Sequence, residues 1–209
     1  MKRLTLPLSR EDALSLRAGD TVLLSGTLYT GRDAAHKRLV ALLEEGKPLP
    51  FPIEGQTIYY VGPAPARPGR PVGPAGPTTS YRMDAYTPAL LRCGLRAMIG
   101  KGRRSPQVVA AMKEAGAVYF GATGGAAALI SRAIVSAEVV CYEDLGAEAV
   151  HRFEVRDFPA VVLIDSQGND LYEIGPEKYR LYGRPDKYFR TLPGVAANSI
   201  DFSPMFYTI

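Results

Sequence analysis

The sequence predicts an α/β protein in which one compact domain covers residues 1–180 and a C-terminal arm covers residues 181–209. Apolar runs of strand length alternate with segments of helical period along most of the chain, which is typical of a mixed fold of helices and sheet. A length of 209 residues with 46% hydrophobic and 22% charged residues is sufficient for a hydrophobic core. The residues after the predicted domain have no strong period, so we expect them to form an arm that lies on a partner chain.

The first part of the chain is expected to contain three strands and one helix. In chain order they are strands at 4–8 and 21–29 with a turn at 17–20 between them, a helix at 32–46, and a strand at 57–65. Ala35, Leu39 and Leu43 fall on one stripe of the helix and Gly46 ends it. The third strand runs into a proline-rich connection from Pro63 to Pro77, which we interpret as a ligand-facing loop.

The second part is expected to contain two helices, two strands and a hairpin. In chain order they are a helix within 86–100 after Thr87 and Pro88, a helix at 105–116, strands at 117–123 and 137–144, and a hairpin over 158–174. The helix at 105–116 has the clearest signals, since Ser105 suits the N-cap, Pro106 the first turn and Gly116 the position past the end. Gln167 and Gly168 are expected to form the turn of the hairpin.

The positive charge of the chain is concentrated in its middle. Between Tyr60 and Arg104 the only acid is Asp84, and the basic residues are Arg67, Arg70, Arg82, Arg92, Arg96, Lys101, Arg103 and Arg104. This distribution predicts a cationic face suited to a polyanion. Tyr81 and Tyr86 are too few to stack the bases of a nucleic acid, so small carboxylates or phosphates are the expected ligands.

The cysteines, the N-terminal sequence and the lengths of the apolar runs argue against a disulfide-rich, secreted or membrane-spanning protein. Cys93 and Cys141 are far apart, which excludes a disulfide framework and a metal site of the CxxC type, and we expect Cys93 to lie in the core. The thiolates of any iron–sulfur cluster must therefore come from another chain. The first residues lack the apolar core of a signal peptide, and no apolar run reaches the roughly 20 residues of a membrane span. These features predict a cytoplasmic protein that does not enter a membrane.

Arg32 and Asp33 open the first predicted helix directly after a strand. The N-terminus of a helix favours an anion, and the Arg32 guanidinium can add two parallel hydrogen bonds to a carboxylate. The alternative is that Arg32 is a surface arginine and Asp33 a first-turn acid favoured by the helix dipole. His36 shares a helical face with Arg32, and it either orients a residue of the site or is a half-buried structural side chain.

Two further segments are suited to an anion. Thr78, Thr79 and Ser80 supply hydroxyl groups beside Arg82, although a cluster of this kind can also cap a helix. Lys101 lies between two glycines that allow a ligand to approach the backbone closely, although it can also be a solvated lysine. Neither this loop nor the segment GATGG has the spacing of a phosphate-binding P-loop or a dinucleotide fingerprint, and no metal site is expected.

Five segments, in this order along the chain, resemble the β subunit of class I fumarate hydratases and the equivalent subunit of L(+)-tartrate dehydratase. They are 26–38 (GTLYTGRDAAHKR), 59–65 (YYVGPAP), 76–88 (GPTTSYRMDAYTP), 99–102 (IGKG) and 118–129 (VYFGATGGAAAL). The resemblance covers the chain from about Leu16 to Tyr179. It implies a swivelling β/β/α fold and a partner α subunit, or an N-terminal domain, that holds a [4Fe-4S] cluster with three cysteines. A heterodimer or heterotetramer is then expected.

The resemblance also implies a reaction, which is the reversible hydration of fumarate to L-malate in the tricarboxylic acid cycle. It places Arg32, Arg82 and Lys101 on the carboxylates of the dicarboxylate substrate. It makes Thr78 the base that removes the proton, assisted by an acid of the α subunit, while the open iron of the cluster acts on the departing hydroxyl group as a Lewis acid. The residues that support these groups are then Asp33, His36, Thr79 and Ser80.

Two other functions remain open at the level of the sequence. One is the β subunit of L(+)-tartrate dehydratase, because no residue separates the two substrates. The other is a non-catalytic anion-binding module that has kept the fold, although such a module has no need of all four residues Arg32, Thr78, Arg82 and Lys101.

Overall fold

A computed structural model describes residues 1–122 and 124–180 of the chain. A compact unit covers Met1–Ile174, and a second unit begins at Gly175. The C-terminal arm predicted over residues 181–209 lies outside the described residues. Within the described part, no helix has the length and apolar character needed to cross a membrane.

The prediction of an α/β fold is confirmed. The strands are β1 (Lys2–Leu6), β2 (Thr21–Thr30), β3 (Thr57–Tyr59), β4 (Ala97–Gly100), β5 (Val118–Gly121), β6 (Ile134–Cys141) and β7 (Val150–Ile164). The α-helices are α1 (Arg10–Ser15), α2 (Asp33–Glu44), α3 (Thr87–Arg92), α4 (Pro106–Ala115), α5 (Ala127–Ile130) and α6 (Leu171–Arg180). The short 3₁₀ helices are η1 (Ser80–Met83), η2 (Gly124–Ala126), η3 (Ser131–Ala133) and η4 (Glu143–Glu148).

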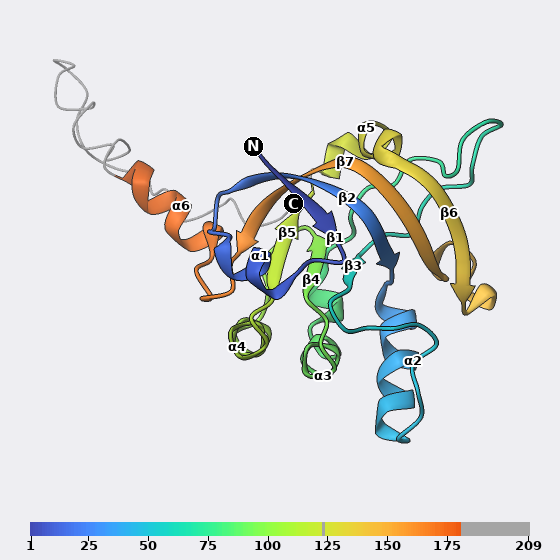
Figure 1. Cartoon of the computed structure of the whole chain (residues 1–209), viewed down its shortest axis with the longest axis horizontal. Helices are drawn as coiled ribbons and strands as arrows, with labels where there is room; N and C mark the ends of the chain where they lie inside the picture. Colours follow the sequence, from blue (N-terminus) through green and yellow to red (C-terminus); the bar gives the residue numbers. More distant parts are fainter. Residues whose placement is uncertain (123, 181–209) are drawn as a thin grey trace, which may run out of the picture. The chain divides into compact units, whose positions relative to one another are not determined.

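The strands form one curved sheet with the order β1-β2-β3-β4-β5-β7-β6 (Figure 1). Strands β1 to β5 are parallel to one another. The long strand β7 is antiparallel to both β5 and β2, so the pairings from β2 through β3, β4, β5 and β7 return to β2. The swivelling β/β/α arrangement implied by the resemblance stays a prediction.

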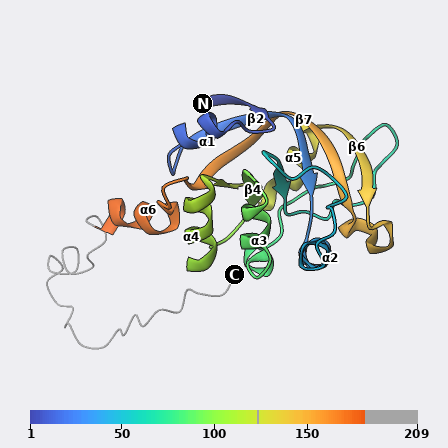
Figure 2. The ribbon, with the colours of Figure 1, turned by 60° about the horizontal axis from the view of Figure 1, so that its bottom comes forward.

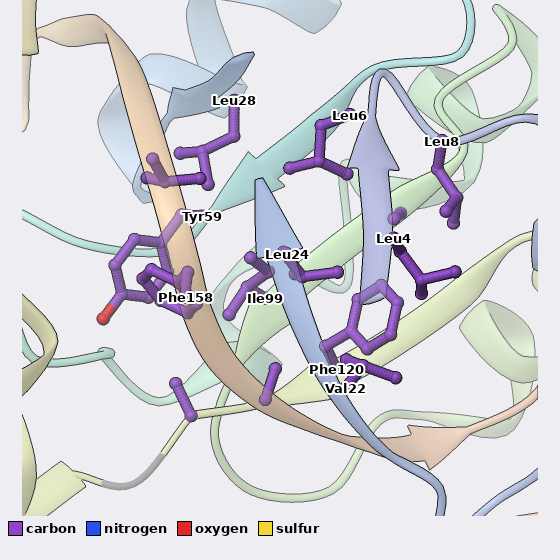
Figure 3. Packing of buried hydrophobic residues seen from close by; sticks show 14 of the residues in the cluster. Leu4, Leu6, Leu8, Val22, Leu24, Leu28, Tyr59, Ile99, Phe120 and Phe158 are labelled. Carbon is purple, nitrogen blue, oxygen red and sulfur yellow. The ribbon is translucent and has the colours of Figure 1, made fainter. Parts of the chain in front are cut away.

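The sheet separates two hydrophobic cores because side chains alternate along each strand. Tyr59, Ile99 and Phe120 face the inner core together with side chains from β1, β2 and β7 (Figure 3). Their neighbours Met98 and Tyr119 face the outer core, which α2, α3 and α4 cover. Figure 2 shows these three helices on one side of the sheet. The three central parallel strands β3, β4 and β5 are therefore buried on both faces, which explains their apolar sequences.

The helix expected within 86–100 is shorter than predicted. Helix α3 ends at Arg92, Gly94 adopts a φ of +95°, and Ala97–Gly100 forms the central strand β4. The prediction was wrong over these four residues because a short, fully buried apolar run has no period that separates a strand from a helix.

The hairpin expected over 158–174 is confirmed only at its turn around Gln167 and Gly168, where Ile164 and Asp170 form an isolated antiparallel bridge, and its second strand is absent from the described residues. Strand β7 ends at Ile164, and the Asp165 carboxylate accepts hydrogen bonds from the amides of Gln167 and Asn169 in a turn. Helix α6 follows where the second strand of the hairpin was expected. The partners of β7 are β2, β5 and β6, which lie earlier in the chain and leave no local signal. Helix α1 was not predicted at all.

Cys93 is exposed at the end of α3, which corrects its expected place in the core. The predicted cationic face also loses one member, because the side chain of Arg104 is fully buried.

Candidate functional site

Three of the predicted site residues, Arg32, Thr78 and Lys101, lie at the edge of the sheet where the parallel strands β2, β3 and β4 end. The pairings Thr30 with Tyr59 and Tyr59 with Ile99 bring the strand ends into register. Arg32 follows β2 by two residues and Lys101 follows β4 directly, so both leave the sheet at the same level. Since neighbouring strands are about 4.8 Å apart, the two backbone positions are separated by roughly 10 Å. This edge is where ligands bind in many open α/β sheets.

The segment Thr78–Ser80 fills the space between the ends of β3 and β4. The Thr78 amide donates to the carbonyl oxygen of Tyr60 at 2.8 Å, and Thr79 forms a parallel bridge with Lys101. The Ser80 amide donates to the carbonyl oxygen of Lys101 at 3.0 Å. The hydroxyl cluster predicted from the sequence is thus held next to Lys101 by main-chain hydrogen bonds.

The Ser80 hydroxyl connects this segment to β4 and β5. It accepts hydrogen bonds from the Lys101 amide at 3.1 Å and from the Tyr119 hydroxyl at 2.8 Å. Gly100 makes this contact sterically feasible, because a Cβ atom there would lie 2.0 Å from the Ser80 oxygen. The alternative role of the cluster as a helix cap is not observed, since Thr79 makes no side-chain capping bond at the start of η1.

Arg82 and Lys101 have exposed side chains beside this segment. Within residues 1–122 and 124–180, neither side chain forms an ion pair with a carboxylate. Their charges are therefore not neutralised by an acid of the described fold, and they remain accessible to an anionic ligand.

Arg32 is held differently. Its Nη1 atom lies 3.1 Å from the Glu148 carboxylate and its Nε atom lies 3.8 Å from the Asp33 carboxylate. The side chain is 23% exposed and lies over Gly62, where a Cβ atom would come within 3.4 Å of Arg32 Cδ. Sequence reasoning did not identify Glu148, because it is far from Arg32 in the chain and lies at the end of the short 3₁₀ helix η4.

His36 lies completely buried under Arg32. Its Nδ1 atom is 2.9 Å from the carbonyl oxygen of Arg32, and its ring packs edge-on against Tyr60 with 5.3 Å between ring centroids. Burial lowers the pKa of His36 to about 4, so the ring is neutral at pH 7 and Nδ1–H donates to the carbonyl group. The ring is fully buried and not half-buried, and its role in orienting Arg32 stays a prediction.

Three polar atoms around the start of α2 are buried without a hydrogen-bond partner among the described residues. They are Arg32 Nε, Asp33 Oδ1 and His36 Nε2. Buried polar atoms are usually paired, so unpaired ones require an explanation such as a ligand or a partner chain.

Sequence reasoning missed the buried residue Arg104. Its Nε atom donates to Asp84 Oδ1 at 2.7 Å and its Nη2 atom donates to Thr87 Oγ1 at 2.8 Å. Its guanidinium carbon lies 5.3 Å from the ring centroid of Tyr60 and 5.1 Å from that of Tyr119. In the sequence, Arg104 belongs to a run of basic residues, and such a run predicts exposed side chains and not a buried one.

The proline-rich connection lines a hollow of about 370 Å³ together with β6 and residues Gly146 and Ala147. This hollow adjoins the segment that carries Glu148, on the side of Arg32. Its lining includes none of the four predicted site residues Arg32, Thr78, Arg82 and Lys101. The hollow therefore does not define the candidate site. We place the candidate site at the strand ends that carry the cations.

The described residues offer no set of metal ligands. No group of three or more His, Cys, Asp or Glu side chains that is suited to a metal ion occurs in residues 1–122 and 124–180. Burial raises the pKa of the Cys141 thiol to about 11, so it is not poised as a thiolate ligand. These residues do not fit an iron–sulfur cluster held by this chain.

Comparison with known proteins agrees with the resemblance described from the motifs. The family model described as Fumarase C-terminus matches residues 2–175. The chain is 45% identical over 152 residues to the anaerobic class I fumarate hydratase of Escherichia coli (strain K12), covering 72% of this chain and 28% of that protein. It is 34% identical over 172 residues to a putative L(+)-tartrate dehydratase subunit beta of Methanocaldococcus jannaschii, covering 79% of this chain and 88% of that protein.

A putative class I fumarate hydratase of Geobacillus stearothermophilus is 39% identical over 175 residues, covering 81% of this chain and 33% of that protein. The chain thus spans only about a third or less of the fumarate hydratases, but most of the tartrate dehydratase subunit.

Proposed function

This chain belongs to the family of fumarase C-terminal domains, and we propose that it is the substrate-binding half of a hydro-lyase that acts on a small dicarboxylate. The reaction proposed is the reversible hydration of fumarate to L-malate. The observation that supports the proposal is that the backbone positions of Arg32 and Lys101 follow the ends of β2 and β4, while the Thr78 amide is hydrogen-bonded to Tyr60 just after β3.

The dimensions of the site suit a dicarboxylate with four carbon atoms. Long arginine and lysine side chains that start roughly 10 Å apart can reach the two ends of one such molecule. Lys101 and Arg82 are available for one carboxylate, and Arg32 for the other. The guanidinium group can bind a carboxylate through two parallel hydrogen bonds, whereas the ammonium group acts as a point charge.

The same cations favour the chemical step. Removal of the C3 proton of malate places negative charge on the neighbouring carboxylate as the transition state forms. Cations fixed beside that carboxylate stabilise the transition state more than the ground state. The hydrogen bonds between Ser80 and Lys101 hold the backbone of Lys101 in place before the substrate arrives, which contributes to electrostatic preorganisation.

Thr78 is the base in this proposal. Its position is fixed by the hydrogen bond from its amide to Tyr60. A threonine hydroxyl is a weak base unless a cation stabilises the alkoxide or a carboxylate accepts its proton. Arg82 lies one short 3₁₀ turn further along the chain and provides the cation, and the carboxylate is proposed to come from the partner.

The partner subunit is proposed from the residues of this chain and from the name of one relative. The described residues do not fit the [4Fe-4S] cluster that the family resemblance implies. The relative from Methanocaldococcus jannaschii, of which the match covers 88%, carries the name subunit beta. We therefore assign the cluster to a separate α subunit, which completes a heterodimer or heterotetramer in the cytoplasm, and this chain to binding and orienting the substrate.

The test is expression of this chain with its α subunit without oxygen, followed by absorbance assays with fumarate, L-malate and L-tartrate. Hydration of fumarate by the complex, and by neither chain alone, is the expected result. Turnover of L-tartrate in place of fumarate would identify a tartrate dehydratase. Binding of all three acids without turnover by the complex would identify a non-catalytic anion-binding module, and turnover by this chain alone without iron would contradict the division of the site.

A further inference from the structure

We propose that Arg104 is the positioning residue that fixes the segment carrying Thr78 and Arg82 against the loop carrying Lys101. The inference rests on the function proposed above, since it concerns the same site. Arg104 does not reach the exposed edge, because its side chain has no exposed area. It acts through the residues it contacts.

The ion pair of Arg104 joins the two segments directly. Asp84 follows η1, which carries Arg82, and Arg104 follows the loop that carries Lys101. One Asp84 oxygen accepts from Arg104 Nε at 2.7 Å, and the other accepts from the Ser105 amide at 2.6 Å. Asp84 thus bonds to two consecutive residues of the other segment.

The remaining donors of the guanidinium reach further elements. Nη2 donates to Thr87 at the start of α3 at 2.8 Å, and Nη1 donates to the Tyr60 hydroxyl at 3.3 Å. Tyr60 is also the residue whose carbonyl oxygen accepts from the Thr78 amide. The planar fork of one arginine therefore connects the end of β3, the start of α3 and the end of η1 through three separate nitrogen atoms, whereas the donors of a lysine all sit on one nitrogen.

Tyr119 adds a second connection between the same two segments. Its ring faces the Arg104 guanidinium at 5.1 Å, and its hydroxyl contacts both Ser80 Oγ at 2.8 Å and the carbonyl oxygen of Gly102 at 3.0 Å. Gly102 and Ser80 belong to the two segments that Asp84 and Arg104 already join. The buried cation and the buried tyrosine thus hold the same pair of segments at two points.

The buried position of the charged Arg104 side chain indicates a role beyond stability. Burying an ion pair costs desolvation energy, and apolar side chains of similar volume often stabilise a protein as well or better. A buried arginine with four directed hydrogen bonds, the fourth from Nη1 to Met98 Sδ in β4, instead specifies one relative position of the elements it joins. Burial opposes the charged form, but Tyr60, Asp84 and Tyr119 raise the pKa of Arg104 above its ordinary value, so the cation persists.

The decisive variant is Arg104→Lys in the complete enzyme with its α subunit, because it keeps the charge and removes the fork. We expect kcat/KM for fumarate to fall at least tenfold while the protein stays folded. The matched control is Arg103→Lys. Arg103 is exposed, and Tyr172 is the one hydrogen-bond and cation–π partner of its side chain among the described residues, so kcat/KM is expected to stay within twofold of wild type.

Hydrogen exchange of the full chain separates positioning from general stability. In Arg104→Lys, the amides of Ser80, Lys101 and Ser105 should exchange at least tenfold faster, because their hydrogen bonds cross between the two segments. The amides of Gly31 and His36, on the Arg32 side, should exchange as in wild type. A rise of equal size at all five amides, or kcat/KM within twofold of wild type, would overturn the proposal.

A second variant covers the case in which Arg104→Lys does not fold. Asp84→Asn keeps the volume of the side chain and removes its charge, and it should give the same local pattern of exchange. Unchanged exchange at Ser80, Lys101 and Ser105 in that variant would also overturn the proposal. If the wild-type complex hydrates no dicarboxylate, the proposed function fails, whereas the exchange data still decide whether Arg104 joins the two segments.

Discussion

The proposed dicarboxylate site has an Arg32 half, formed by Arg32 at the start of α2, and a Lys101 half, formed by Lys101 and Arg82. The two halves hold their cations in opposite ways. On one side, the Arg32 side chain is paired with Glu148 at 3.1 Å and lies beside Asp33 at 3.8 Å. On the other side, Lys101 is exposed and pairs with no acid of the described residues, while its backbone is fixed by Ser80. The charge of Arg32 is therefore partly neutralised in advance, whereas the charge of Lys101 is available in full to a ligand. The larger electrostatic contribution to turnover should come from Lys101.

The strongest test of this difference is Lys101→Ala. We expect kcat/KM of the complex to fall by about 10²- to 10³-fold, the range found when a preorganised group that stabilises transition-state charge is removed. The melting temperature should stay within about 2 °C of wild type, because an exposed side chain contributes little to a core. Steady-state kinetics and thermal unfolding check the two parts. A collapse of the melting temperature would show that the loop is structural and that the assignment of Lys101 is wrong.

Lowering the pH should destabilise the fold through protonation of His36, which lies in the Arg32 half of the site. His36 has a pKa of about 4 in the fold and an ordinary value of 6.5, so the unfolded chain binds more protons between these values. The stability that His36 contributes is complete above about pH 6.5 and is lost as the pH falls towards 4, by up to about 3 kcal/mol.

The measurement is urea unfolding at several values of pH in wild type and in His36→Asn. The asparagine keeps a donor for the carbonyl group of Arg32 but does not titrate, so the loss of stability between pH 6.5 and 4 should be smaller by about the same amount. Parallel curves for the two proteins would show that the His36 ring is not held neutral by burial.

The Lys101 half should instead be sensitive to a single methyl group. In Gly100→Ala the new Cβ atom would lie 2.0 Å from the Ser80 oxygen, so we expect the free energy of unfolding to fall by about 2 kcal/mol. The control is Gly125→Ala, where a Cβ atom meets nothing within 4 Å and the change should be near zero. Chemical denaturation measures the free energy of unfolding of both variants. Equal values for Gly100→Ala and Gly125→Ala would mean that the Ser80 side chain does not pack closely against Gly100 in β4.

Particular residues show how much of this arrangement could be predicted from the sequence. Helix α4 has the predicted N-cap at Ser105 and a left-handed residue at Gly116, because both signals are local. Arg32, Thr78 and Lys101 could be selected because glycines, hydroxyl groups and strand ends mark them in the chain. Strand β4 was mistaken for part of a helix, since only its pairing with β3 and β5 shows what it is.

The residues that position the site were harder to predict than the residues that line it. Glu148 and Asp84 meet their arginines across long stretches of chain, and nothing near them in the sequence indicates an ion pair. Arg104 belongs to a basic run with an exposed neighbour, Arg103, and only the fold distinguishes them. Side-chain direction after a strand depends on tertiary packing, which explains why these roles are visible only in the structure.

The smallest expected effect is that of Glu148→Gln, which releases Arg32 from its ion pair. Stability should change by about 0.5 kcal/mol or less, because both side chains are partly exposed to water. The KM for the dicarboxylate should change by only a few-fold, since Arg32 keeps its charge. Kinetics of the complex check this expectation, and a loss of turnover as large as in Lys101→Ala would show that the two halves do not differ as described.

The most direct test of the account is a crystal structure of the complete enzyme, prepared without oxygen, with L-malate or L-tartrate bound. We expect one carboxylate within about 3 Å of Lys101 or Arg82 and the other within about 3 Å of the Arg32 guanidinium. A dicarboxylate bound to only one of these two groups of residues, or at another place on the chain, would contradict the claim that both halves act on one substrate.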